Sequence, residues 1–230
     1  YIQAPFEEVP PLVEHLNKTI RTELELPLMD VEFEAFFDYW TTANSKNRNF
    51  GIITWPESKK GDLKVTGYGL KAANSSPVTK DIQRTIFRMI SEGAEENQVS
   101  QFIRPISLSL KKGERTAEEI APYGRLGKAS YDRIPPNAAK GALYYNANMN
   151  PIEPFRVGDS GQWLYVNAVP KGLPSTNIVS FRDAEEIKDF SLDYDLMVDK
   201  FIRKKLEPIY EVLEWDVGFA CGDKKPKEYW

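Results

Sequence analysis

The stretch VEFEAFFDYW (residues 31–40) sets the expected fold of the first third of this chain. Val, Phe, Tyr and Trp are dense here and acidic residues alternate with them, a pattern typical of an extended strand. Two further extended runs follow, FGIITW (50–55) and DLKVTGYGL (62–70), separated by the turn ESKKG (57–61). Because short turns join consecutive runs, we expect the three runs to form an antiparallel sheet.

An amphipathic helix is expected before this sheet. Apolar residues recur at helical spacing from Val9 to Leu24, and YIQAP (1–5) is typical of the end of a strand. One helix and three strands are too few to cover both faces of a sheet. Residues 1–74 are therefore predicted to be an incomplete α/β (α+β) unit.

A mostly helical part is expected from AANSSP (72–77) onward. Ser76 followed by Pro77 is typical of a helix start, because serine can cap the helix and proline lacks the N–H that would go unpaired there. The elements expected beyond it are a helix to Gly93, a helix over 95–110, irregular chain over 113–154 with a short helix at 138–145, strands at 163–169 and 177–181, a long helix over 194–213 and a polar tail from Gly218.

The composition excludes several classes of protein. With 41% hydrophobic residues the chain can bury a core. One cysteine, Cys221, cannot form an internal disulfide, and with one histidine, His15, there is neither a zinc set nor a Ser-His-Asp triad. No apolar run reaches the roughly 18 residues of a membrane helix. No secretory signal is visible, so we expect a cytoplasmic protein, or one of the host cytoplasm if the source is viral.

The charge is patterned along the chain, although its net value is only −4. Residues 1–43 carry two bases and nine acids (−7), and residues 44–80 carry seven bases and two acids (+5). Residues 111–140 carry seven bases and four acids (+3), and residues 153–199 carry four bases and nine acids (−5). The basic bands are typical of a nucleic-acid footprint, and equally of ordinary solvated faces.

Two acidic pairs could bind a divalent cation. Glu32 and Glu34 lie two apart on an extended run, which places both carboxylates on one sheet face. The same alternation is typical of any exposed strand face. Asp193 and Asp195 also form a pair, but their position before a long helix favours capping of its free N–H groups.

In order and content these motifs resemble the C-terminal part of a family B DNA polymerase, most closely the T-even-like phage branch. YIQAP (1–5) is similar to the residues after the family's Asp-Thr-Asp metal motif, and VEFEAF (31–36) to its acid-bearing strand. The resemblance implies that Glu34 is an accessory carboxylate near the metal ions and that Glu32 is its neighbour.

The resemblance also implies a set of DNA contacts. The turn at Lys46 and Arg48 is similar to the family's basic turn that holds the primer, and Lys140 matches a thumb base that approaches the duplex. The residues implied for DNA binding are Lys46, Arg48, Lys71, Ser76, Arg133, Lys140 and Tyr145. For the turn at Lys46 and Arg48, a hairpin turn that is basic for solubility alone is the competing interpretation, and the segment with Arg133 and Lys140 is similarly ambiguous.

The division implied by the resemblance is the rest of the palm at 1–74, the thumb at 75–219 and a flexible tail at 220–230. No Asp-Thr-Asp occurs in the sequence. A larger N-terminal polymerase chain would therefore supply the metal aspartates with their Mg²⁺, the fingers and the exonuclease. The chain is expected to bind primer–template DNA, to be inactive alone, and to offer its tail to a sliding clamp.

Two alternatives from other classes remain open. One is a non-catalytic DNA-binding module that assists replication. The other is a self-sufficient metal nuclease that uses Glu32, Glu34, Asp193 and Asp195.

Overall fold

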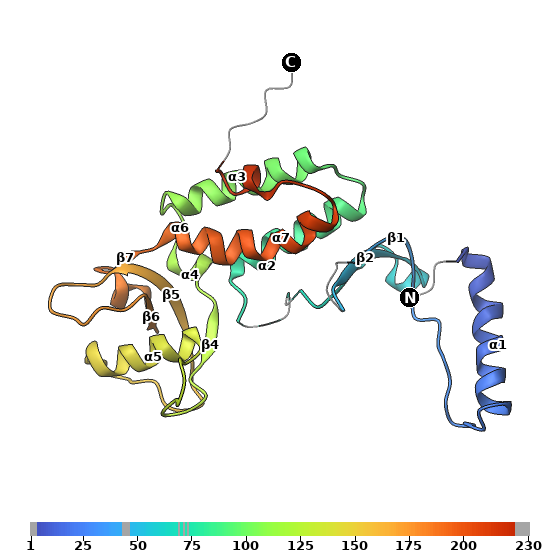
Figure 1. Cartoon of the computed structure of the whole chain (residues 1–230), viewed down its shortest axis with the longest axis horizontal. Helices are drawn as coiled ribbons and strands as arrows, with labels where there is room; N and C mark the ends of the chain where they lie inside the picture. Colours follow the sequence, from blue (N-terminus) through green and yellow to red (C-terminus); the bar gives the residue numbers. More distant parts are fainter. Residues whose placement is uncertain (1–3, 43–46, 69, 71, 73, 224–230) are drawn as a thin grey trace, which may run out of the picture.

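The structure, a computed structural model, describes residues 4–42, 47–68, 70, 72 and 74–223. Figure 1 shows three regions: a first sheet beside a separate helix, a central group of helices, and a unit built on a second sheet. Helices occur together with two antiparallel sheets. The predicted α/β (α+β) class is therefore confirmed.

The first sheet has the predicted order. Its strands are β1 (Phe36–Thr42), β2 (Asn49–Trp55) and β3 (Leu63–Thr66). The prediction of a strand from residue 31 is wrong, because β1 begins five residues later. Phe36 pairs with Trp55 at the end of β2, and Pro56 has no N–H to extend the ladder. Residues 31–35 consequently have no strand partner.

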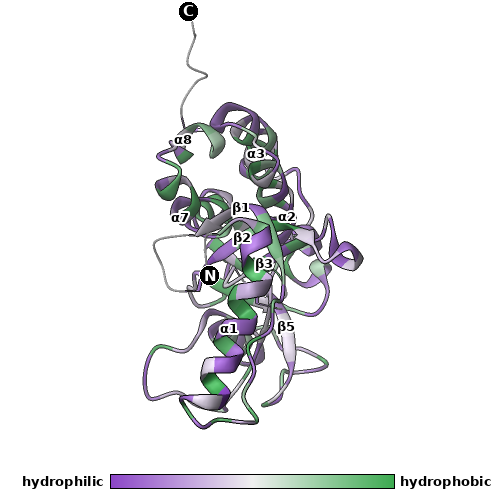
Figure 2. Ribbon diagram, turned by 90° about the vertical axis from the view of Figure 1, so that its right-hand side faces the viewer, coloured by the Kyte–Doolittle hydropathy of each residue, from purple (hydrophilic) through white to green (hydrophobic). Residues whose placement is uncertain are grey.

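The predicted N-terminal helix is α1 (Val9–Thr22), preceded by the 3₁₀ turn η1 (Phe6–Glu8). None of its residues is buried. α1 is seen in front in Figure 2, where it carries both hydrophobic and hydrophilic residues. An aromatic cluster links η1 to the sheet, because the Phe6 ring lies against Phe36 of β1 with centroids 5.3 Å apart. Phe33 joins the cluster by stacking on Trp55 at 4.4 Å between centroids.

The central helices share one core with the first sheet. They are α2 (Pro77–Ser91), α3 (Glu96–Lys111), α4 (Ala117–Ile120), α6 (Tyr194–Met197), a π-helical segment (Val198–Arg203), α7 (Lys204–Val212) and α8 (Val217–Ala220). The α2 residue Phe87 stacks on Phe50 of β2 at 4.3 Å between centroids, and both are fully buried. α2 thus joins the sheet to the helical region.

The predicted long closing helix is interrupted by the π-helical segment. Thr79 of α2 donates a hydrogen bond to the Phe201 carbonyl, and Gln83 donates one to the Lys205 carbonyl. Pro208 lacks the N–H that would pair with the carbonyl four residues earlier. The hydrogen bonds of Thr79 and Gln83 tie α2 to the backbone of the π-helical segment and of α7.

The second sheet confirms the predicted strand pair and adds two short strands. Its elements are β4 (Tyr123–Arg125), β5 (Ser160–Ala168), β6 (Ile178–Phe181), β7 (Ser191–Leu192), the helix α5 (Asn137–Asn148) and the 3₁₀ turn η3 (Ala184–Ile187). α5 packs closely on β6, since a Cβ on Gly141 would lie 2.7 Å from the Ser180 backbone nitrogen.

Candidate nucleic-acid interface

The structure describes only one of the three residues that are predicted to contact DNA beside the first sheet. Lys46 and Lys71 lie outside the described residues. Arg48 is half-buried. Its side chain lies beside the chain that leaves β3, since a Cβ on Gly67 would be 3.0 Å from it. Burial raises the pKa of Tyr68, and the positive charge of Arg48 partly opposes this rise. The structure therefore positions Arg48 against the chain that follows β3.

The two acids predicted near the metal ions do not share a strand face. Glu32 and Glu34 precede β1 and are exposed. Lys64 of β3 forms an ion pair with Glu34 at 2.6 Å. The hydrogen bond and the charge of Lys64 lower the pKa of Glu34. This carboxylate is ionised and already has a cation beside it.

The second acidic pair caps a helix, as predicted. Asp193 accepts a hydrogen bond from the Leu196 backbone N–H at 2.9 Å, and Asp195 lies in the first turn. Among the residues that the structure describes, no three His, Cys, Asp or Glu side chains come together in a way that could hold a metal ion. The described residues therefore do not fit Mg²⁺ by themselves. The nuclease alternative needs a metal centre, and these residues do not form one.

Two residues predicted to contact DNA are internal. Ser76 precedes α2 but does not cap it; its buried hydroxyl donates to the Ile120 carbonyl instead. Tyr145 is also buried, and its hydroxyl donates to Glu186 at 2.6 Å. Burial, reinforced by Glu186, raises the pKa of Tyr145. Both hydroxyls already have protein partners, so neither is free to reach a phosphate in this arrangement.

The two cations predicted to contact DNA around α5 are accessible to different degrees. Arg133 is exposed in the loop before α5, and within the described residues no ion pair engages it. Lys140 is half-buried on α5, where its ammonium donates to the Asn177 side chain at 2.5 Å. The neutral amide of Asn177 does not neutralise the ammonium of Lys140. Both cations remain able to attract a polyanion.

Sequence reasoning missed two further cations near Arg133. Arg125 ends β4 and donates to the Gly158 carbonyl at 3.0 Å, while Lys128 follows in the loop. The sequence feature that indicates these two cations is the basic band at 111–140. With Arg133 and Lys140 they give residues 123–140 four bases against one acid, Asp132. We call this set of four the basic cluster of residues 123–140.

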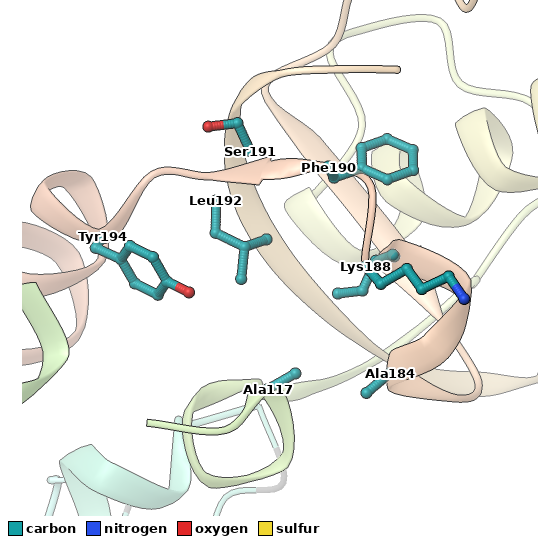
Figure 3. A pocket seen from close by; sticks show the side chains of 8 residues that line it. Ala117, Ala184, Lys188, Phe190, Ser191, Leu192 and Tyr194 are labelled. Carbon is teal, nitrogen blue, oxygen red and sulfur yellow. The ribbon is translucent and has the colours of Figure 1, made fainter. Parts of the chain in front are cut away.

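A pocket of about 480 Å³ lies away from these cations, between α4 and the chain around β7. Figure 3 shows Lys188, Ser191 and Tyr194 among the side chains that line it. Lys188 is paired with Glu185 at 3.3 Å. None of the residues predicted to act in catalysis or DNA binding lines this pocket.

Comparison with known proteins gives a structural match. The family B DNA polymerase from the hyperthermophilic archaeon Pyrobaculum calidifontis superimposes with a TM-score of 0.55, at 16% sequence identity and over 85% of this chain. The fold is that of part of a family B DNA polymerase. The match covers 24% of the archaeal chain, so this chain spans about a quarter of that polymerase's length.

The similarity is confined to structure. No protein-family model matches the sequence, and no curated protein is similar to it in sequence. The structural match is to an archaeal enzyme, and it does not support the T-even-like phage branch. Every helix in the described parts of the chain is too short or too polar to span a membrane.

Proposed function

We propose that this chain is the C-terminal palm portion and thumb of a template-directed DNA polymerase, and that it holds the primer–template duplex. The observation that carries this proposal is the fold shared with a family B DNA polymerase. The proposed division is palm at 1–74, thumb at 75–219 and tail at 220–230. Because the chain spans a quarter of that polymerase, the remaining parts would come from a larger polypeptide, either joined to it or separate.

The chemistry of nucleotide addition would depend on that larger polypeptide. The metal ions that activate the primer hydroxyl need a set of acidic ligands. The described residues do not form such a set, so the Mg²⁺ ligands would lie in the missing part, together with the fingers and exonuclease. Glu34 would adjust the local charge through its pair with Lys64. A closer relation to the T-even-like branch and a clamp contact in the tail also remain proposals.

An exposed apolar segment supports a missing partner. Five large apolar side chains of residues 24–31 are exposed, and Leu28 is 100% exposed. A groove of about 720 Å³ runs between α1 and the pair Phe33 and Trp55. Soluble chains rarely leave large contiguous apolar surfaces uncovered. We propose that the rest of the palm covers this segment, which we call the apolar connector.

The apolar connector gives a testable expectation about association. The purified chain is expected to self-associate with increasing concentration, because the side chains at Leu28 and Met29 can bury apolar area against another copy. The double variant Leu28→Ser, Met29→Ser should shift sedimentation toward the monomer. The equally exposed Ile152, outside the connector, provides the matched control Ile152→Ser. Equal effects of both variants would argue against a specific partner surface.

The basic cluster of residues 123–140 supports the DNA-holding part of the proposal. Neutralising Arg133 or Lys140 to Ala should weaken binding of a primer–template duplex for every sequence alike. Each lost phosphate contact should reduce the slope of log affinity against log salt by about one unit. Fluorescence anisotropy across a salt series measures both quantities.

Two controls make this experiment specific. Lys59→Ala removes an equal charge at the tip of the β2–β3 hairpin, where we expect no DNA. Asn177→Ala removes the hydrogen bond of Lys140 but keeps the charge. If Lys59→Ala changes the salt slope as much as Arg133→Ala, general charge alone acts and the assignment of contacts is wrong.

The second candidate function is a DNA-binding accessory module of replication. The observation that favours it is that the described residues form no metal site. Both candidates expect duplex binding. They differ in one requirement. Only the first candidate requires that this chain activates a polymerase polypeptide that lacks the end of its palm and its thumb.

A further inference from the structure

The pocket beside β7 has a mostly apolar lining. The lining side chains come from α4, from η3 and from the chain on both sides of β7. The apolar ones are Ala117, Ala184, Ile187, Phe190, Leu192 and the ring of Tyr194. In Figure 3 Leu192 points toward Ala117, while the ammonium of Lys188 points away from Leu192 and Tyr194. The volume of about 480 Å³ lies in the range of pockets that bind small ligands.

The segments that build this pocket are strongly acidic. Residues 183–195 carry six acids and one base, Lys188, and α4 adds two more acids. Every one of these acids lies within two positions of a lining residue, so its carboxylate is on the order of one Debye length, roughly 8–10 Å, from the pocket. Within the described part of the chain, no ion pair engages Glu118, Asp189 or Asp195. The pocket therefore favours a cationic occupant.

The last described residues lie beside the C-terminal end of α3. A Cβ on Gly222 would be 2.8 Å from the Leu108 side chain. The next residue, Asp223, forms an ion pair with Lys111 at 3.0 Å. Lys111 is the final residue of α3. The chain is thus fixed at this end of the helix by one packing contact and one ion pair.

The same end of α3 adjoins the pocket. Gly113 follows α3 by two residues, and a Cβ on it would be 2.8 Å from the ring of Tyr194, which lines the pocket. Residues 224–230 lie outside the described residues. A segment of that length spans at most about 25 Å when extended. This is enough to reach Tyr194 from Asp223, because only the Lys111 side chain and two residues separate them.

The chemistry of residues 224–230 complements the pocket. Their sequence, KKPKEYW, has three lysines and one acid, followed by two aromatic residues. We propose that this segment docks in the pocket of its own chain, with the Trp230 ring on the apolar lining and the lysines beside the acids. This inference does not depend on the proposed function. A partner that binds the tail would have to displace the segment, so the contact would be autoinhibitory toward that partner.

Cross-linking of the full chain tests this contact. A carbodiimide joins a lysine to a carboxylate only where the two groups meet, and mass spectrometry identifies the joined residues. We expect lysines of 224–230 to be joined to carboxylates of the pocket segments, namely Glu118, Asp189 or Asp195. Sodium chloride at about 1 M should lower the yield, because it screens exposed charges. If these lysines are joined only to other carboxylates, or to none, docking in this pocket is wrong.

Two variants test the electrostatic and the apolar part separately. Asp189 is exposed, and Asp189→Lys should lower the yield of the remaining links about two- to fivefold, the factor for one exposed ion pair. Glu8→Lys makes the same change of charge in η1 and should behave as wild type. Trp230→Ala keeps every charge and should lower the yield by a larger factor, because it removes the apolar area that docking buries. If neither Asp189→Lys nor Trp230→Ala lowers the yield, the proposal fails.

A mixture of ¹⁵N-labelled and unlabelled chain distinguishes docking within one chain from docking between two copies. Links that join residues of one isotope only support the proposal. Links between labelled and unlabelled residues would mean that the segment docks on a second copy, and would overturn it. Circular dichroism checks that each variant is folded. Duplex binding measures the proposed function separately, so failure of one proposal leaves the other standing.

Discussion

The purified chain, given primed template, nucleotides and Mg²⁺, is expected to leave the primer unextended while it binds the duplex. Nucleotidyl transfer needs metal ions held at the reacting oxygens. The described residues bring no three metal-ligating side chains together, and Glu34 is paired with Lys64. Adding a polypeptide that ends in a Tyr-x-Asp-Thr-Asp motif and carries the fingers should raise extension by about 10³-fold or more, the scale of metal-ion catalysis.

A gel-based extension assay on copurified and separately mixed proteins measures this effect. A contaminating host polymerase is the main source of false activity. Trace extension by the chain alone should therefore be compared with extension by the Glu34→Gln variant, because this substitution does not change the activity of a contaminating polymerase. Robust extension that belongs to the chain itself would overturn the proposed dependence on a larger polypeptide.

The regular elements with strong apolar periodicity could be predicted from the sequence. α2 and α3 carry clear stripes, and both lie where the spacing places them. The alternation in VEFEAF predicts a strand, but only Phe36 of this run joins one, because whether a residue joins a sheet depends on its partner strand. β2 ends at Trp55, and nothing within 31–36 encodes where that end falls.

Which of the predicted site residues are accessible also depends on tertiary packing. A pair of adjacent tyrosines on a helix does not reveal which one faces the core, and the structure buries Tyr145 while Tyr144 reaches the Pro174 carbonyl. Arg125 and Lys128 lie in chain without periodicity. The position of their loop depends on backbone hydrogen bonds between Leu126 and the loop before β5, a long-range contact that local patterns do not encode.

Phe87→Ala is expected to lower the free energy of unfolding by about 3–5 kcal/mol, the range for removing a buried aromatic ring and leaving a cavity. Phe87 is fully buried and lies between the first sheet and the helices. It stacks on Phe50 and packs against Tyr68 with ring centroids 4.7 Å apart. For a chain of this size the loss corresponds to a fall in melting temperature of roughly 10 °C.

The same substitution tests whether this core couples the proposed palm to the proposed thumb. The chain has five tryptophans, so urea unfolding of the two regions is followed by fluorescence in variants that keep a single one, either Trp55 in the first sheet or Trp163 in the second. If Phe87 joins one cooperative unit, both signals should shift to lower urea together. Leu28→Ala, at a fully exposed position, should change stability by no more than about 0.5 kcal/mol. An early shift of the Trp55 signal alone would instead mean that the two regions unfold independently, and that the interface around Phe87 contributes little to holding the first sheet against the central helices.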